Sequence, residues 1–326
     1  MITIHFLSQN QQVHQQEFTP GDALPPGTLW IDLLSPSQGE ELAITSVTGI
    51  KIPSREQIWK NETLNRFYEE NGTHYMTAAV ITKVGTPYPA TSAITFICTP
   101  NYLLTLRYVA PTSFANFALR LARFPHKFSS GPRVLEGLLE EVISRVAYNS
   151  EHVVNRLDEL SHVIFGRANV GEKEKPTTTS MMKQMLKDLG NAADLNSKIN
   201  ESLHSLSRLV LYVSQVNAEK ELNKALRTLT NDVQALMKQT AFLSDKITFL
   251  LDATLGMINA EQNLIIKLFS MVTVFLMPPT LIGSIYGMNF AHMPELNWAL
   301  GYPAALLLMV ICAIFPYVYF RRKGWL

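Results

Sequence analysis

Two long segments without charged residues, close together near the C-terminal end, constrain this chain more than any other feature. The first runs from Leu268 to Ile285 and the second from Leu300 to Phe320, and neither contains Lys, Arg, Asp or Glu. A helix rises 1.5 Å per residue and the hydrocarbon core of a bilayer is about 30 Å thick, so about 20 apolar residues span it. Both segments are therefore predicted to be transmembrane helices.

The composition of the rest of the chain excludes several classes of protein. Only 17% of the 326 residues are charged and the net charge is +1, so no nucleic-acid partner is expected. Cys98 and Cys312 are too few for a disulfide framework and lack metal-ligand spacing, so both are expected to pack as ordinary apolar residues. The N-terminus has neither a basic region nor a long apolar run, so no cleaved signal peptide is expected.

The N-terminal third is predicted to be a mixed α/β domain. Residues 1–7 and 29–34 have strand character, and Ser37 followed by Glu40 is typical of a helix start. Asn71-Gly72 joins residues 66–70 to 73–82, and this dipeptide favours a type I′ hairpin. A second hairpin is predicted from residues 93–98 and 102–108.

From Thr112 onward the pattern predicts helices. Helical spacing of apolar residues covers 134–165 and 181–216, with a polar break at 166–179. A third helix is predicted from Glu219 without a break until Pro278, about 60 residues or about 90 Å, which is typical of a stalk leading into a membrane. The expected division is an α/β part (1–110), a helical part (111–217), a stalk continuing into the first span (218–285), a loop (286–297), a second span (298–320) and a basic tail (321–326).

The positions of the basic residues predict the orientation. Lys267 precedes the first span and Arg321, Arg322 and Lys323 follow the second, whereas the loop between the spans has no Lys or Arg and a single acid, Glu295. The positive-inside rule then places both termini in the cytoplasm and only the short loop outside. The short outside loop leaves no room for an external sensing domain, which weighs against a two-pass receptor, whereas a pore or transporter with an external mouth fits better.

A polar stripe runs along one face of the stalk and the first span. Its members recur at alternating steps of four and three residues, and most are small or polar. Small residues also let helices pack closely, so Ser270 and Thr273 alone would not indicate a pore. Two spans cannot enclose a channel, so a pore requires several copies around a common axis. The stripe comprises Asp252, Gly256, Asn259, Asn263, Ile266, Ser270, Thr273, Met277, Thr280 and Ser284.

The stripe and the loop offer chemistry suited to magnesium. Mg²⁺ dehydrates reluctantly, so a site for it has to offer oxygen acceptors to its bound waters, as the amides of Asn259, Asn263 and Asn289 do. Met277 and Ile266 are large apolar members of the stripe, suited to a constriction that gates by excluding water. Ordinary helix packing is the alternative role for these two residues.

At this point the residues carry a resemblance to a known family. The run Tyr286-Gly287-Met288-Asn289, followed by Met293-Pro294-Glu295-Leu296 and by the ending Tyr319 to Leu326, resembles the CorA family of magnesium transporters. The resemblance implies a homopentamer with an α+β cytoplasmic funnel domain, a long helical stalk and two C-terminal transmembrane helices per subunit. It also implies transport of hydrated Mg²⁺, with Co²⁺ and Ni²⁺ as secondary substrates.

The resemblance also assigns roles to residues. It places Gly287, Met288 and Asn289 in a selectivity loop, with Glu295 as the loop acid because Ala291 stands where many members have one. It makes Met277 and Ile266 hydrophobic gate positions, and Asn263 and Thr280 polar pore positions. The basic collar at the cytoplasmic exit consists of Lys267, Arg321, Arg322 and Lys323.

The cytoplasmic sensor departs from the family pattern. Many members carry a Glu-Asp pair that contributes to an inter-subunit regulatory divalent site, whereas this chain has Glu56-Gln57, and the stalk partner falls near Thr228 with Asp232 one turn on. Glu56 and Asp232 are the candidate regulatory ligands. Glu136, Glu140 and Glu141 are alternatives, although each acid singly fits a solvated helix face.

The expected function is channel-like uptake of Mg²⁺ across a bacterial inner membrane. No enzyme motif is present, so no catalytic residue and no cofactor are expected; Mg²⁺ is the transported ion and a candidate regulatory ion. Expected partners are further copies of the chain, membrane lipids and divalent cations. Transport of zinc or another transition metal is the alternative, favoured only by His292, and a membrane-anchored signalling scaffold is a remote one.

Overall fold

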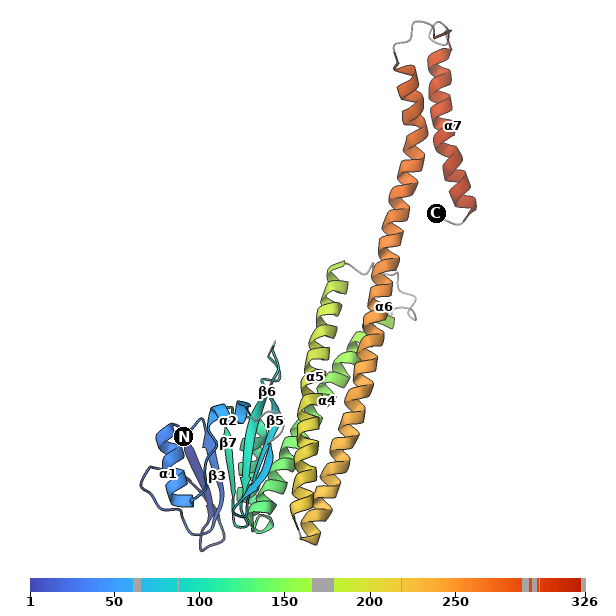
Figure 1. Cartoon of the computed structure of the whole chain (residues 1–326). Helices are drawn as coiled ribbons and strands as arrows, with labels where there is room; N and C mark the ends of the chain where they lie inside the picture. Colours follow the sequence, from blue (N-terminus) through green and yellow to red (C-terminus); the bar gives the residue numbers. More distant parts are fainter. Residues whose placement is uncertain are drawn as a thin grey trace. The chain divides into compact units, whose positions relative to one another are not determined.

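The computed structural model describes residues 1–60, 66–86, 88–165, 179–217, 219–288, 293–294, 298 and 300–323 (Figure 1). The chain forms two compact units, Met1–Leu251 and Asp252–Leu326. The long helix α6 contributes residues to both. The predicted polar break at 166–179 lies almost entirely outside the described residues.

The first unit contains a seven-stranded mixed sheet. Its strand order is β2-β1-β3-β7-β6-β5-β4, and every pair is antiparallel except β3 and β7, which are parallel. A parallel pair requires a crossover connection, and here the chain from β3 to β7 passes through α1, α2 and the β4–β6 meander. The strands are β1 (Ile2–Leu7), β2 (Val13–Glu17), β3 (Thr28–Leu34), β4 (Phe67–Glu70), β5 (Thr73–Thr82), β6 (Ala90–Cys98) and β7 (Leu103–Arg107).

Both predicted hairpins are confirmed. Asn71 and Gly72 have φ angles of 51° and 72°, the positive values that a type I′ turn between β4 and β5 needs. Strand β2 was not predicted from the sequence. Four of its five residues are exposed, so it lacks the alternating apolar pattern of a half-buried strand and is recognisable only by its pairing with β1 at the sheet edge.

The helices follow the predicted order. The capping box predicted at Ser37 and Glu40 starts the first helix. The short helix α2 was not predicted, whereas α3 lies in the part predicted to be helical from Thr112 onward. The long last helix of the stalk continues through Pro278 and Pro279. The helices are α1 (Gln38–Thr48), α2 (Arg55–Lys60), α3 (Thr112–Arg123), the 3₁₀ turn η1 (Pro125–Lys127), α4 (Gly131–Phe165), α5 (Thr179–Val216), α6 (Lys220–Tyr286) and α7 (Gly301–Arg322).

Helices cover both faces of the sheet (Figure 1). On one face, Ile44 of α1 and Ile58 of α2 pack with Ile31 and Leu33 of β3 in one buried cluster. On the other face, α4 contacts β3, β6 and β7, and α5 contacts β5. Alternate residues of each strand therefore enter separate apolar layers, which explains why the central strands β3 and β7 read as nearly continuous apolar runs.

A buried ion pair joins the two parallel strands. Both carboxylate oxygens of Asp32 accept hydrogen bonds from Arg107, from Nε at 2.9 Å and from Nη2 at 2.6 Å. Thr105 Oγ1 donates to Asp32 Oδ1 at 2.7 Å and accepts from Trp30 Nε1 at 2.9 Å. The His5 ring stacks on Trp30 with centroids 4.6 Å apart. Because Asp32 and Arg107 are both buried, the complete set of hydrogen bonds is needed to offset their desolvation.

Burial lowers the pKa of His5 from 6.5 to about 4, although the neighbouring Asp32 carboxylate opposes this shift. Below pH 6.5 the unfolded chain therefore binds a proton at His5, whereas the folded chain does not bind it until about pH 4. The free energy of unfolding consequently decreases as the pH falls, and the folded state becomes less stable. We expect His5 to lower the free energy of unfolding by about 2 kcal/mol at pH 5 relative to pH 8. In the His5→Phe variant, thermal unfolding of the full-length protein should lose correspondingly less stability over this range. The exposed His14 provides the matched control, His14→Phe, and equal losses in all three proteins would contradict the prediction.

Candidate ion pathway

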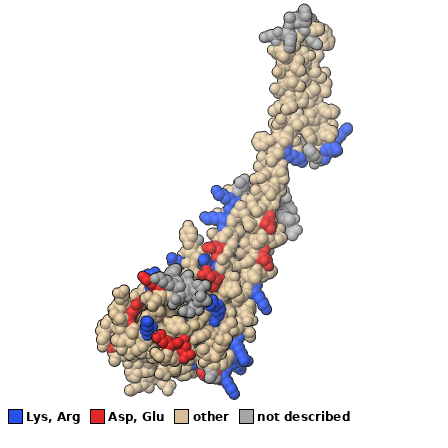
Figure 2. Space-filling model, viewed as in Figure 1, with Lys and Arg blue, Asp and Glu red and all other residues tan. Residues whose placement is uncertain are grey.

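Two helices of the structure are long and apolar enough to cross a membrane by length and composition. Among the described residues these are α6, through its C-terminal part, and α7. Almost none of the side chains in their most apolar windows is buried in the single chain. On the face drawn in Figure 2, the apolar parts of α6 and α7 show no Lys, Arg, Asp or Glu except for a basic group at one end. Their apolar surface fits a hydrocarbon surrounding.

Helix α7 packs against one face of α6. Met271 is the one buried residue of this face, and Phe275 contacts the rings of Tyr317 and Phe320 at 6.4 and 6.2 Å between centroids. Gly283 lies close to Met309, since a side chain built at Gly283 would meet Met309 Cε at 3.6 Å. The sequence did not single out these contacts, because every face of an uncharged segment is apolar enough to pack.

The polar stripe lies on a different face of α6. All ten residues of the stripe, from Asp252 to Ser284, are exposed in the single chain, whereas the face centred on Met271 and Phe275 is covered. The two sets occupy different angular positions on a helix of 3.6 residues per turn. The structure therefore places the predicted stripe on one uncovered face, in the same unit as the two spans.

The hydroxyl groups of the stripe are satisfied by their own helix. Ser270 donates to the carbonyl of Ile266 at 2.8 Å, Thr273 to that of Phe269 at 2.9 Å, and Thr280 to that of Leu276 at 2.6 Å. A hydroxyl has one proton and two lone pairs, so once the proton is used the oxygen faces outward as an acceptor. This face can accept hydrogen bonds from the water shell of a cation.

Two large apolar side chains interrupt the stripe. Ile266 is 61% exposed and Met277 is 64% exposed, and both project from the same face as the hydroxyls. Exposed apolar side chains on a polar face are the arrangement that a water-excluding constriction requires.

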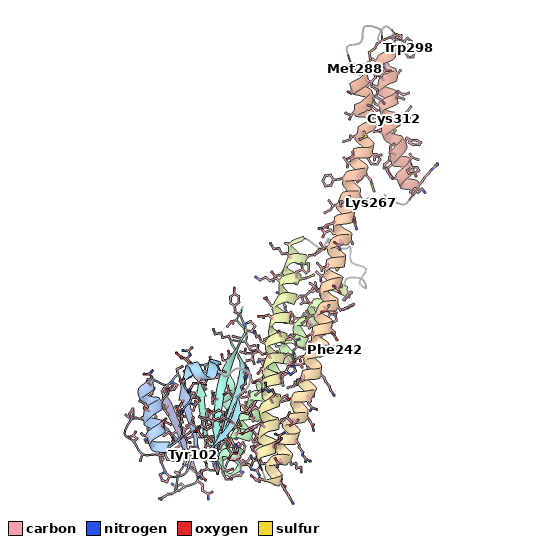
Figure 3. The ribbon with its side chains drawn as sticks, in the orientation of Figure 1. Tyr102, Phe242, Lys267, Met288, Trp298 and Cys312 are labelled. Atoms are coloured by element: carbon pink, nitrogen blue, oxygen red, sulfur yellow. The ribbon has the colours of Figure 1, made fainter. Side chains whose placement is uncertain are left out.

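The start of the loop is described and the rest of the motif is not. Gly287 donates its N–H to Gly283 at 3.0 Å and Met288 donates to Ile285 at 3.2 Å, which closes the last turn of α6. A side chain at Gly287 would approach the Gly283 carbonyl to 3.2 Å, so a glycine suits this turn. Met288 lies at the end of α6 and is 46% exposed (Figure 3). Asn289 and Glu295 lie outside the described residues.

The predicted basic collar is exposed. Lys267 precedes the apolar part of α6 (Figure 3), and Arg321 and Arg322 form the last turn of α7, followed by Lys323. Phe275 of α6 contacts Tyr317 and Phe320 of α7, so these basic residues lie toward the same end of the two-helix unit. Basic side chains at that end fit anchoring at a membrane surface.

The two candidate regulatory acids, Glu56 in the first turn of α2 and Asp232 on α6, are both exposed. Gln57 has a local structural role, because its Oε1 accepts from the N–H of Ser54 at 3.0 Å and its own N–H donates back to Ser54 Oγ at 3.4 Å. This capping box gives Gln57 a structural role at the start of α2. The described part of the chain holds no group of three or more His, Cys, Asp or Glu arranged to bind a metal.

The alternative acids on α4 are engaged with other side chains. Glu140 forms a 2.5 Å ion pair with Arg120, and Glu141 accepts from Asn116 at 3.2 Å. Burial, reinforced by the neighbouring Glu140, raises the pKa of Glu136. These contacts indicate a structural role for the group at the α3–α4 packing.

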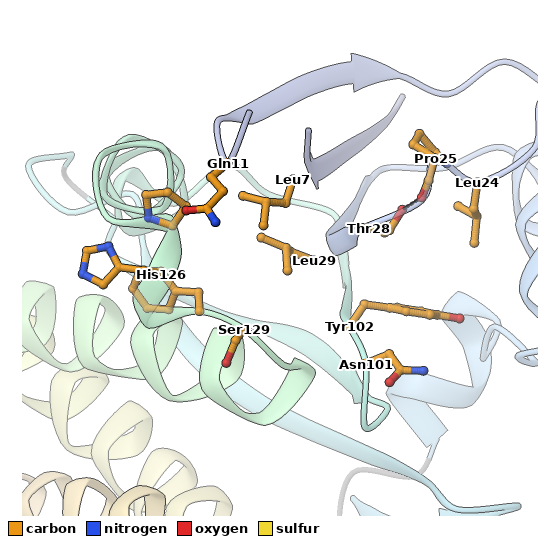
Figure 4. A pocket seen from close by; sticks show the side chains of 13 residues that line it. Leu7, Gln11, Leu24, Pro25, Thr28, Leu29, Asn101, Tyr102, His126 and Ser129 are labelled. Atoms are coloured by element: carbon orange, nitrogen blue, oxygen red, sulfur yellow. Dashed lines mark hydrogen bonds between the residues drawn. The ribbon is translucent and has the colours of Figure 1, made fainter. Parts of the chain in front are cut away.

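A cavity of about 700 Å³ lies in the first unit (Figure 4). It is bounded by the ends of β1 and β3, the β6–β7 turn with Asn101 and Tyr102, and the segment containing Pro125 and Ser129. None of its lining residues is Asp, Glu, Lys or Arg, so it offers no carboxylate to a divalent cation.

Comparison with known proteins assigns the family. The profile described as "CorA-like Mg2+ transporter protein" matches residues 26–322. The chain belongs to this CorA-like family. It is 30% identical over 322 residues to the magnesium transport protein CorA of Yersinia pseudotuberculosis, covering 98% of this chain and 99% of that one. It is also 30% identical over 299 residues to CorA of Escherichia coli, covering 91% and 92%.

The fold agrees with that of a solved family structure. The complete CorA magnesium transporter of Methanocaldococcus jannaschii superimposes with a TM-score of 0.78 at 19% identity, covering 100% of this chain and 99% of that one. The predicted fold class, an α+β domain with a long helical stalk and two C-terminal candidate spans, is thereby confirmed. The CorA-like family is one of transporters, in keeping with the expectation of a non-enzyme.

The uncovered stripe of this CorA-like chain predicts a difference in water access between two faces of α6. In a Cys312→Ser background and reconstituted protein, Thr280→Cys should react roughly ten times faster or more than Ile282→Cys with a charged methanethiosulfonate, because only a thiolate in contact with water reacts. Ile282 is the matched control at almost the same depth, on the face near α7. Equal, slow labelling of both would show that the stripe faces lipid or protein.

Proposed function

We propose that this chain forms a homo-oligomeric channel-like transporter that carries Mg²⁺ into the cytoplasm. The observation that supports it most strongly is the uncovered polar face of α6 in a member of a Mg²⁺ transporter family. Polar side chains in a membrane need polar partners or a water-filled space. One chain binds the hydroxyl protons of this face to its own carbonyls but leaves the hydroxyl oxygens facing outward as acceptors. Several copies arranged around an axis provide a shared water path for these acceptors.

The number of copies comes from the family resemblance alone, which implies a pentamer. Closed cyclic symmetry places the same face of every subunit toward the axis. In that arrangement α6 lines the pore and α7 lies outside it, because α7 packs on the face of Phe275 rather than on the stripe.

The transported ion crosses this pore with part of its water shell. Mg²⁺ exchanges water reluctantly, and oxygen acceptors outside the first shell can bind its coordinated waters. Asn289 and the backbone around Gly287 would supply such acceptors at the external loop, with Asn259, Asn263 and the stripe hydroxyls along the pore. Ile266 and Met277 form the constriction, and Co²⁺ and Ni²⁺ are secondary substrates.

The membrane potential drives uptake. A divalent ion gains about 4.6 kcal/mol for each 100 mV of inside-negative potential. The positive-inside rule places both termini in the cytoplasm of a bacterial cell, with the collar of Lys267 and Arg321 to Lys323 at the inner surface. Glu56 and Asp232 are the proposed regulatory ligands. Because Gln57 is an amide held in a capping box, we expect cytoplasmic Mg²⁺ to close the pore less strongly than it would through a site with an additional acid.

Removal of the Asn289 amide tests the assignment of the transported ion and of the loop. Proteoliposomes with an inside-negative potential should take up Mg²⁺, and Asn289→Ala should abolish this uptake because the external site loses its acceptors. Asn297→Ala, in the same loop but outside the motif, should transport like the wild type. Uptake by Asn289→Ala at the wild-type rate would contradict the loop assignment, and Zn²⁺ entering in preference to Mg²⁺ would favour the transition-metal alternative.

Substitution of Met277 tests the constriction. Met277→Thr replaces an apolar side chain by one that hydrogen-bonds water, so it should raise Mg²⁺ uptake at high internal Mg²⁺ several-fold. Leu276→Thr is the control, since Leu276 is also exposed but lies outside the stripe. If both variants changed uptake equally, the effect would come from helix packing rather than from wetting of the pore.

A further inference from the structure

Three side chains with soft or borderline ligand atoms line one small cavity in the first unit. His74 and Met76 lie two residues apart on β5, so they point to the same face of the sheet. Cys98 of β6 is the direct cross-strand partner of His74. All three line a cavity of about 210 Å³, which Pro132 and Leu135 of α4 and residues near the end of α5 complete.

The spacing of these side chains suits a single metal ion. Directly opposed residues in an antiparallel pair have Cβ atoms about 4.5–5.5 Å apart, a separation that one ion bridges through bonds of about 2.0–2.3 Å. Met76 is the diagonal neighbour of Cys98, and its flexible thioether can reach across. Met76 and Cys98 are 1% and 5% exposed, so bulk water does not compete freely for the position.

A neighbouring tyrosine orients the histidine. Tyr212 of α5 places its hydroxyl 3.2 Å from His74 Nδ1, and the two rings meet edge to face. A metal-binding histidine that donates one ring N–H to such a partner is held in orientation, and its other nitrogen is then free to bind the metal. Tyr212 is therefore a candidate supporting partner for the three side chains.

The charge of the cavity selects the ion. None of its lining residues is Asp, Glu, Lys or Arg, and a net charge without a partner is costly in such surroundings. One thiolate with a monovalent cation is neutral, whereas one thiolate with Zn²⁺ leaves a net positive charge. Thiolate and thioether sulfur also favour Cu⁺ over hard cations. We propose that His74, Met76 and Cys98 form a binding site for a soft monovalent metal ion, Cu⁺.

Binding of a metal ion by Cys98 requires the thiol to lose its proton. Burial raises the pKa of Cys98 to about 12, and its Sγ lies 3.6 Å from the Thr99 carbonyl as a weak hydrogen-bond donor. A protonated, buried thiol is a poor nucleophile. When Cu⁺ binds, the Cu–S bond replaces the S–H bond and the released proton passes to the solvent, with no change of oxidation state.

This site is independent of the proposed transport pathway. None of its residues belongs to the stripe, the loop or the basic collar, and Mg²⁺ prefers oxygen ligands over sulfur. The sequence did not indicate it, because His74 and Cys98 lie on different strands and form no metal-ligand spacing along the chain.

Competition with a chromogenic chelator tests the proposal. The full-length protein in detergent, without oxygen and with a reductant, should remove one Cu⁺ per chain from bicinchoninate. Cys98→Ser should weaken Cu⁺ binding by roughly 100-fold or more, because the loss of the thiolate ligand exceeds the 10- to 100-fold cost of losing a supporting group. Met76→Leu should weaken it by about tenfold, because the thioether is a neutral ligand. Cys312→Ser, the variant of the other cysteine, should bind like the wild type, and Zn²⁺ in excess should not displace Cu⁺.

X-ray absorption on the copper-loaded wild type is a second readout that does not depend on folding of a variant. It should show both sulfur and nitrogen in the first shell of the copper. The proposal is overturned if the wild type takes no Cu⁺ from bicinchoninate, if correctly folded Cys98→Ser binds Cu⁺ as tightly as the wild type, if Zn²⁺ displaces Cu⁺, or if the copper shell contains no sulfur.

Discussion

A polar group that enters a membrane has to be satisfied by the protein, and this requirement decides what α6 can present. The hydroxyls of Ser270, Thr273 and Thr280 give their protons to carbonyls of the preceding turn. The helix therefore needs no polar partner for these protons, and the outward-facing lone pairs become acceptors. The same three bonds that make the hydroxyls tolerable in an apolar segment make the face suitable for a hydrated cation.

Helix α7 determines which face of α6 stays uncovered. Helix α7 takes the face of α6 that contains Met271 and Phe275, and it leaves the stripe uncovered. Because α7 occupies one face of α6, the face that α7 leaves uncovered is the one available to other copies. The proposed homo-oligomer therefore rests on packing inside one chain, which leaves the outward-facing acceptors of the stripe available to water between copies.

The first unit depends on contacts between residues that are distant in the sequence. Asp32 and Arg107 tie the only parallel strand pair of the described sheet, and Asn196 of α5 donates to the Thr240 carbonyl and to Ser244 Oγ of α6, both at 2.9 Å. The same long-range pairing brings His74 and Cys98 together. Local sequence signals contain none of these partnerships. The hairpin at Asn71-Gly72 and the capping box at Ser37 were predictable because each is a property of a few adjacent residues.

The sequence by itself determined the two candidate spans, the phase of the polar stripe, the hairpins and the family motif at Tyr286 to Asn289, since hydrophobic periodicity and turn chemistry are local. It also showed the departure at Gln57, but not the capping role that Gln57 fills. Only the tertiary structure decided that β2 joins the edge of the sheet, because its exposed residues show no apolar pattern. It also decided that α7 leaves the stripe uncovered, and that His74, Met76 and Cys98 line one cavity without charged residues. The physical reason is that these features depend on which surfaces meet, and surfaces meet according to the packing of the whole unit rather than the propensity of any one segment.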